Sequence, residues 1–150
     1  HTRSSAASDV YKRQESMSQI EDSLAGILEI IPDGPIIVGG FSQGGAMASA
    51  LLETEASSSI VGLVLIATKT ARPEELRVSL PLLKPRPVIW MHGKRDHLVP
   101  LDLGMEHIEI FEESGWPVTR FEHEKGHMVN LNQFDEMREQ VSVMAKNSQR

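Results

Sequence analysis

The stretch Gly39-Gly40-Phe41-Ser42-Gln43-Gly44-Gly45 decides how this chain folds. The residues before it, Pro35-Ile36-Ile37-Val38, form an apolar and mostly β-branched run, which is typical of a buried strand. The residues after it, 46–52, are small or apolar and predict a helix that packs against a sheet. A serine therefore lies at the apex of a sharp glycine turn that joins a strand to a helix.

The turn contains the pattern G-x-S-x-G, formed by Gly40, Ser42 and Gly44. Because these glycines have no Cβ, the strand and the helix can pack closely on either side of the serine. The resulting strain pushes the hydroxyl out of the sheet, next to the free N–H groups and the positive dipole end of a helix. The pattern therefore favours Ser42 as a nucleophile.

Two other interpretations of the turn are open at this point. A serine directly before a helix often serves only as its N-cap. A glycine-rich turn can also hold a phosphate group, but the chain has neither G-x-G-x-x-G nor a G-K-[ST] ending here. The sequence downstream is needed to distinguish a nucleophile from an N-cap.

The composition sets broad limits on the function. A length of 150 residues suggests one domain, and the lack of cysteine excludes disulfides, thiolate metal sites and cysteine nucleophiles. The longest apolar run, Leu63–Ala67, is too short to span a bilayer, and no signal peptide is visible. We therefore expect a cytoplasmic protein without a transmembrane segment.

Residues 1–14 resemble an in-frame translation of a sequencing adapter, most clearly over Ser4–Gln14. They have no apolar periodicity, so we predict an artefactual, disordered tail. A read that begins with adapter also begins within a gene, so we expect the natural N-terminal part to be missing and 15–150 to be the C-terminal part of a catalytic domain.

The chain is acidic, with a formal net charge of −6, and residues 1–14 are themselves basic. An acidic remainder without a basic stripe argues against binding to nucleic acid or to an anionic membrane surface. Nothing in the sequence indicates an oligomeric state.

Helical and strand patterns alternate along the chain. Apolar periodicity predicts helices over residues 15–31, 46–55, 102–114 and from about 132 onward. Apolar runs predict strands over 35–38, 60–67, 87–92 and 117–122, the last one half-exposed near the sheet's edge. Residues 57–59 are expected to be a loop, and 68–86 to be irregular apart from one helical turn at 73–76. This order predicts an α/β domain with a mostly parallel sheet and helices on both faces.

Three side chains that support hydrolytic chemistry each follow a predicted strand: Ser42, Asp96 and His127. Sites in such sheets lie outside the carboxyl ends of the strands, so we expect these residues to converge. A serine hydroxyl is a poor nucleophile without a base. His127 can take its proton, Asp96 can orient the imidazole, and the backbone N–H of Gln43 can stabilise an oxyanion.

The other histidines offer alternatives to His127 as the base. His92 precedes residues 94–100, the loop that contains Asp96 (the acid loop), so we expect it to pack beneath the site. His97 is too close to Asp96 along the chain to share a hydrogen bond easily. His107 lies in the middle of a predicted helix and is expected at the surface. His123 lies nearer the strand and is the serious competitor.

Asp102 is the alternative acid, but it falls at a predicted helix start, where a carboxylate needs no catalytic reason. The helical spacing of Met105, Met137 and Met144 predicts that these side chains belong to the core.

Three motifs in this order resemble those of the phospholipase/carboxylesterase family of α/β-hydrolases, which includes acyl-protein thioesterases. They are the glycine turn at 39–45, the run His92-Gly93-x-x-Asp96-x-Leu98-Val99-Pro100, and Gly126-His127. The resemblance extends from about Ser16 to the C-terminal helix. It implies Ser42 as nucleophile, Asp96 as acid and His127 as base, acting through an acyl-enzyme on small carboxylic esters or thioesters. It also implies that no metal or organic cofactor is needed.

The chain departs from the family pattern at several positions. Lys94 replaces a usual acidic residue, His97 replaces a usual proline, and Thr68–Thr70 differs from the segment that shapes the acyl pocket. The family's early strands are absent, together with the loop that supplies a second oxyanion donor. We therefore expect a partial α/β-hydrolase fold with an exposed, aggregation-prone strand edge at 35–38. A non-catalytic binding module of the same fold and an inactive fragment are the alternatives.

Overall fold

The computed structural model describes residues 3–148, and the chain divides into two units, residues 1–32 and 33–150. In the first unit, helix α1 runs without interruption over Arg3–Ile30. The sequence predicted a helix from residue 15, and this helix extends back to residue 3, into the segment for which the sequence predicted an artefactual, disordered tail. This segment contains no proline or glycine, so the neighbouring helix can extend through it at little cost. Its origin as translated adapter stays a prediction.

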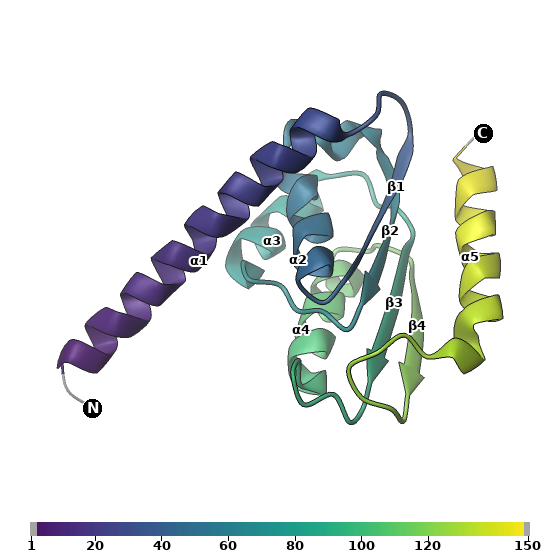
Figure 1. Cartoon of the computed structure of the whole chain (residues 1–150). Coiled ribbons are helices and arrows are strands. Elements are labelled where there is room, and N and C mark those ends of the chain that lie inside the picture. The colour runs from purple at the N-terminus through teal and green to yellow at the C-terminus, as the bar shows by residue number, and fades with distance from the viewer. Residues whose placement is uncertain (1–2, 149–150) are drawn as a thin grey trace. The chain divides into compact units, whose positions relative to one another are not determined.

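The second unit is built on four parallel strands: β1 (Ile36–Phe41), β2 (Ile60–Ile66), β3 (Val88–Gly93) and β4 (Val118–His123). They lie in the order β1-β2-β3-β4, so each strand pairs with its neighbour in sequence (Figure 1). All four carboxyl ends therefore meet at one edge of the sheet, as the strand–helix alternation predicted.

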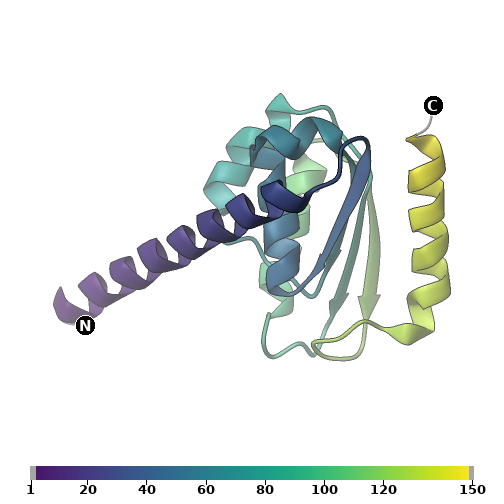
Figure 2. The ribbon, with the colours of Figure 1, turned by 45° about the horizontal axis from the view of Figure 1, so that its top comes forward.

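Helices cover both faces of this sheet, which confirms the predicted fold class (Figures 1 and 2). On one face, α2 (Gln43–Ala50) packs on β1 and β2 and α4 (Leu101–Glu113) packs on β3 and β4, while α3 (Pro73–Ser79) packs against α4. On the other face, α5 (Phe134–Asn147) lies across β2 and β3.

Two connecting segments are more regular than the sequence suggested. Residues 57–59 belong to a 3₁₀ helix, Glu55–Ser59, and are not a loop. Within 68–86, the single helical turn expected at 73–76 is part of the longer helix α3, and a 3₁₀ helix follows at Leu80–Leu82. Pro73 begins α3 because a first helical position needs no N–H donor.

The core lies between the two central strands and the helices on either side. The side chains of Leu63, Leu65, Trp90 and Met91 are fully buried. Beneath α5, Met137 and Met144 join a cluster with residues of the sheet, as their spacing predicted: Ile66, Ile89, Met91 and Phe121. Met105 is only half-buried, and its sulfur lies 3.3 Å from Nη1 of Arg120.

Among the described residues, β1 pairs with β2 on one side only, so its other edge is unpaired. Phe41, at the end of this strand, is 43% exposed. The expected open edge is therefore present, whereas its tendency to aggregate stays a prediction. No helix within residues 3–148 is both long and apolar enough to cross a lipid bilayer.

Candidate active site

Ser42 lies between β1 and α2 in a backbone conformation that residues other than glycine rarely adopt, with φ 56° and ψ −121°. Such a conformation costs about 1–3 kcal/mol and tends to occur at functional sites. Two hydrogen bonds hold it: its N–H donates to the carbonyl of Ile66 at 2.8 Å, and its carbonyl accepts from the N–H of Gly45 at 3.0 Å. Its side chain makes no capping hydrogen bond to α2, so the N-cap interpretation is not supported.

Close packing at this turn depends on Gly40 and Gly45, whereas a Cβ on Gly44, which the pattern also predicted to be excluded, would meet nothing within 4 Å. A Cβ on Gly40 would overlap the backbone of Gly44, and a Cβ on Gly45 would come within 2.5 Å of the Thr68 side chain. The start of α2 can therefore approach both β1 and the end of β2. Gln43 is the first residue of α2, so its N–H belongs to the turn that has no carbonyl partner within the helix.

Asp96 follows β3, and its side chain is fully buried. Oδ1 accepts hydrogen bonds from the N–H groups of Leu98 at 2.9 Å and Val99 at 2.8 Å, and Oδ2 lies 2.8 Å from Nδ1 of His127. Burial acts to raise the pKa of Asp96, but the hydrogen bonds from Val99, His127 and Leu98 outweigh it and hold this pKa below its usual range. The carboxylate is therefore ionised near neutral pH.

His127 lies in the loop after β4, and its side chain is 17% exposed. Because a carboxylate only accepts, Nδ1 of His127 donates to Asp96, which leaves Nε2 free to accept a proton. The ring lies against Phe41, the residue before Ser42, with 4.8 Å between the ring centroids. The structure thus brings the loops after β1, β3 and β4 together. Within residues 3–148, no hydrogen bond joins the Ser42 hydroxyl to His127.

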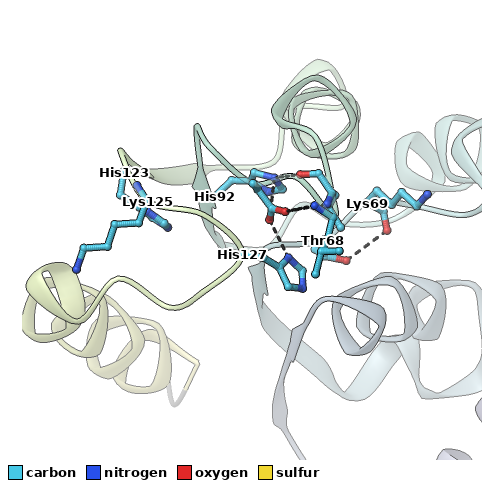
Figure 3. A network of polar contacts seen from close by, with 9 residues as sticks. Thr68, Lys69, His92, His123, Lys125 and His127 are labelled. Atoms are coloured by element: carbon cyan, nitrogen blue, oxygen red, sulfur yellow. Dashed lines mark hydrogen bonds and ion pairs between the residues drawn. The ribbon is translucent and has the colours of Figure 1, made fainter.

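The competing base, His123, faces away from this arrangement and into its own loop. Its side chain is buried, and its Nδ1 accepts the N–H of Lys125 at 3.1 Å. Burial lowers the pKa of His123. His123 therefore supports the loop that carries His127, and Figure 3 shows the two rings in their different positions.

The other residues considered as base or acid, His92, His97 and Asp102, do not pair in the way that His127 and Asp96 do. His92 packs beneath the site, fully buried, as expected, and His97 is exposed. Asp102 lies exposed in the first turn of α4 and, in the described part of the chain, makes no hydrogen bond to a histidine.

The surface position predicted for His107 is wrong. This ring is fully buried on the inner face of α4, 5.9 Å from the ring of Phe111 one turn later. Burial lowers the pKa of His107 to about 4. The spacing of four residues to Phe111 was the signal in the sequence that could have placed it inside.

Sequence reasoning also missed Ala67 at the end of β2. Ala67 is a second non-glycine residue with a positive φ, 51°, and its N–H donates to the carbonyl of Met91 at 2.9 Å. This kink directs Thr68, which is buried, onto Gly45 beside the Ser42 turn. An alanine carries no sequence signal for such a conformation, so only the structure shows it.

Among residues 17–148, whose side chains the structure describes, no group of three or more histidine, aspartate or glutamate side chains is arranged to hold a metal ion. The absence of a cofactor stays a prediction that the resemblance implies.

Comparisons with known proteins agree with this fold. The family model described as Phospholipase/Carboxylesterase matches residues 2–144. Three solved structures share the fold. Arabidopsis thaliana SOBER1 is 17% identical, and the match covers 86% of this chain and 64% of that chain with a TM-score of 0.64. A Bacillus cereus carboxylesterase is 16% identical, with 90% of this chain and 61% of that chain covered and a TM-score of 0.61; Zea mays acyl-protein thioesterase 2 is 17% identical, with 82% of this chain and 62% of that chain covered and a TM-score of 0.58.

The chain therefore spans less than two thirds of the length of these structures. No curated protein sequence matches it. The family model nevertheless covers nearly the whole chain and confirms the resemblance seen in the three motifs. By this match, the chain belongs to the phospholipase/carboxylesterase family.

Proposed function

We propose that this chain carries the catalytic triad of a serine hydrolase that acts on carboxylic esters or thioesters. The observation that carries the proposal is the hydrogen bond of 2.8 Å between Nδ1 of His127 and Oδ2 of Asp96, next to the strained Ser42 turn. The order Ser42, Asp96, His127 along the chain is that of α/β-hydrolases.

In this mechanism, Oγ of Ser42 attacks the carbonyl carbon of the substrate while Nε2 of His127 accepts the hydroxyl proton. Asp96, ionised because hydrogen bonds lower its pKa, stabilises the imidazolium. The imidazolium then protonates the departing alcohol or thiol, and an acyl-enzyme remains on Ser42. Water, deprotonated by His127, hydrolyses that ester and restores the serine. The N–H of Gln43 donates to the oxyanion at both stages.

The substrate class follows from the family and from the names of similar proteins, which include a carboxylesterase and an acyl-protein thioesterase. We expect a small molecule with an ester or thioester group. Residues 15–150 then form the C-terminal part of a catalytic domain, and a cytoplasmic location stays a prediction.

A second candidate is a binding module of the same fold without activity. It is favoured by one observation: the chain spans less than two thirds of the length of the similar structures. Loss of one oxyanion donor typically lowers kcat by roughly 100- to 1,000-fold, so a missing upstream donor would leave little activity.

The test is covalent labelling of the 150-residue chain with a fluorophosphonate, together with aryl-ester hydrolysis by a version extended with its upstream gene sequence. Ser42 should be labelled, and Ser42→Ala should abolish labelling and hydrolysis. The control is Ser58→Ala, which removes an exposed serine next to the amino end of β2, at the edge of the sheet opposite to the carboxyl ends of the strands. An extended protein whose hydrolysis survives Ser42→Ala would contradict the triad, and unlabelled Ser42 would favour the binding module.

A further inference from the structure

We propose that His92 is a positioning residue, which holds Asp96 in the orientation that pairs with His127. The inference rests on the proposed function for its consequence in catalysis, but its geometry stands on its own. The evidence is the set of contacts that His92 makes beneath the acid loop (Figure 3).

His92 lies in β3, and its side chain is fully buried. Its Nε2 lies 2.8 Å from the carbonyl oxygen of Val99. A carbonyl oxygen can only accept, so Nε2 carries a proton and donates it to this bond. The ring therefore ties the central strand to the far end of the acid loop, seven residues later.

Val99 connects this bond to Asp96. The carbonyl of Val99 accepts from His92, while its N–H donates to Oδ1 of Asp96 at 2.8 Å. Nε2 of His92 also lies 3.7 Å from Oδ2, the same oxygen that accepts from His127. One imidazole N–H thus holds the turn that fixes one carboxylate oxygen and lies close to the other.

The position of the ring is fixed from two sides. Trp90 stacks against it, with 5.7 Å between centroids and 16° between planes. On α4, a Cβ at Gly104 would come within 2.5 Å of Nδ1 of His92, so only glycine leaves room for the ring. His92 cannot move without disturbing one of these contacts.

The consequence is a chain of hydrogen bonds from the core to the candidate base. Without the donor at residue 92, the Val99 carbonyl loses its partner and the turn at 96–99 can rotate. The carboxylate of Asp96 would then present Oδ2 less accurately to Nδ1 of His127. The cost would appear in the reactivity of Ser42, since small misplacements of catalytic groups reduce rates strongly.

Two substitutions at residue 92 separate the donor from the packing. His92→Gln places an amide N–H about as far along the side chain as Nε2, whereas the amide of His92→Asn ends at the level of Nδ1. We expect His92→Gln to keep most of the fluorophosphonate labelling rate of Ser42 in the 150-residue chain. We expect His92→Asn to lower that rate roughly 10- to 100-fold.

A third variant reaches the same bond without changing any donor. Gly104→Ala pushes the ring from the α4 side and should lower the labelling rate as His92→Asn does. The matched control is Gly26→Ala in α1, where a new Cβ meets nothing within 4 Å. Labelling should be unchanged in this control.

A second measurement does not depend on activity. The proton that His127 Nδ1 donates to Asp96 should give a far-downfield proton NMR signal in the unaltered chain and in His92→Gln. The signal should weaken or disappear in His92→Asn and Gly104→Ala while circular dichroism shows both variants folded.

Several results would overturn the positioning role. One is a His92→Asn chain with the NMR signal and labelling rate of the unaltered chain. Another is a loss of equal size in His92→Gln and His92→Asn, which would mean that packing alone matters. Absence of the signal from the unaltered chain would also overturn it. The proposed function fails separately, when Ser42 of the unaltered chain takes no label although the downfield signal is present.

Discussion

At the scale of single residues, the site depends on polar groups whose partners come from the loops around them. Asp96 is fully buried yet ionised, because three hydrogen bonds compensate for the loss of water around its carboxylate. In His107 the effect of burial dominates instead: it outweighs a hydrogen bond with the Thr68 backbone and lowers the pKa to about 4, so the ring is neutral near pH 7. We therefore expect changes at Asp96 to affect the reactivity of Ser42, and His107 to affect the stability of the chain in acid.

Asp96→Asn should abolish most of the reactivity of Ser42 while leaving the fold intact. An amide can donate to Nδ1 of His127 and so favours the tautomer whose Nε2 carries the proton. We expect the fluorophosphonate labelling rate to fall about 10³- to 10⁴-fold. The control is Asp102→Asn, an exposed carboxylate at the start of α4, which should keep the rate. Equal losses in the two variants would exclude Asp96 as the acid.

His107 should make the chain less stable in mild acid. Its pKa is about 4 when folded and about 6.5 in an unfolded chain, so the unfolded state binds the proton more readily. The stability that depends on the neutral ring is fully present above about pH 6.5. As the pH falls toward 4, the free energy of unfolding decreases by about 3 kcal/mol in total.

The measurement is urea unfolding of the unaltered chain and of His107→Leu at pH 7 and at pH 4.5. The loss of stability between these two pH values should be smaller in His107→Leu, whereas Ser58→Ala should keep the full loss. An identical loss in His107→Leu would show that His107 is not buried as a neutral ring.

At the scale of elements, the glycines of the strand–turn–helix unit around Ser42 differ in how much space surrounds them. A Cβ at Gly45 would come within 2.5 Å of Thr68, whereas a Cβ at Gly44 meets nothing within 4 Å. Gly45→Ala should therefore destabilise the chain by about 1–3 kcal/mol through overpacking. Gly44→Ala should stabilise α2 by up to about 1 kcal/mol. Thermal unfolding of the two variants measures both effects, and a reversed order would contradict the packing of Thr68 on Gly45.

The two edges of the sheet also differ, since β1 is apolar while β4 carries Arg120 and Glu122. Charged side chains on an edge strand hinder pairing with another chain. We expect the 150-residue chain to self-associate through β1, and Ile36→Lys to reduce this association. Analytical ultracentrifugation over a range of concentrations measures it. Thr119→Lys on β4 is the control, and an equal effect of both variants would place the association elsewhere.

At the scale of the whole molecule, the unit 33–150 contains all four strands and all three proposed triad residues. Removal of residues 1–14 should therefore leave the labelling rate of Ser42 and the unfolding midpoint nearly unchanged. A large loss of either property would contradict the prediction that this segment is artefactual. The removal leaves α1 from residue 15 onward, the part that the apolar periodicity predicted.

The sequence by itself determined the strand–turn–helix unit, the α/β class and the family. These features depend on local patterns: glycines around Ser42, apolar runs for strands, and apolar periodicity for helices. The same patterns predicted that Ser42, Asp96 and His127 would follow parallel strands and meet at one edge of the sheet. The helix over 3–14 was not foreseen, because it depends on extension from the neighbouring turns and not on an apolar face.

Only the tertiary structure decided which histidine pairs with Asp96 and which lie in the core. His123 and His127 lie in one short segment, and its backbone turns His127 toward Asp96 and His123 into its own loop. His107 was misplaced because a histidine within a helix can face either water or the core. The reason is physical: a hydrogen bond between residues 31 positions apart depends on how loops from different strands pack, which no local pattern encodes.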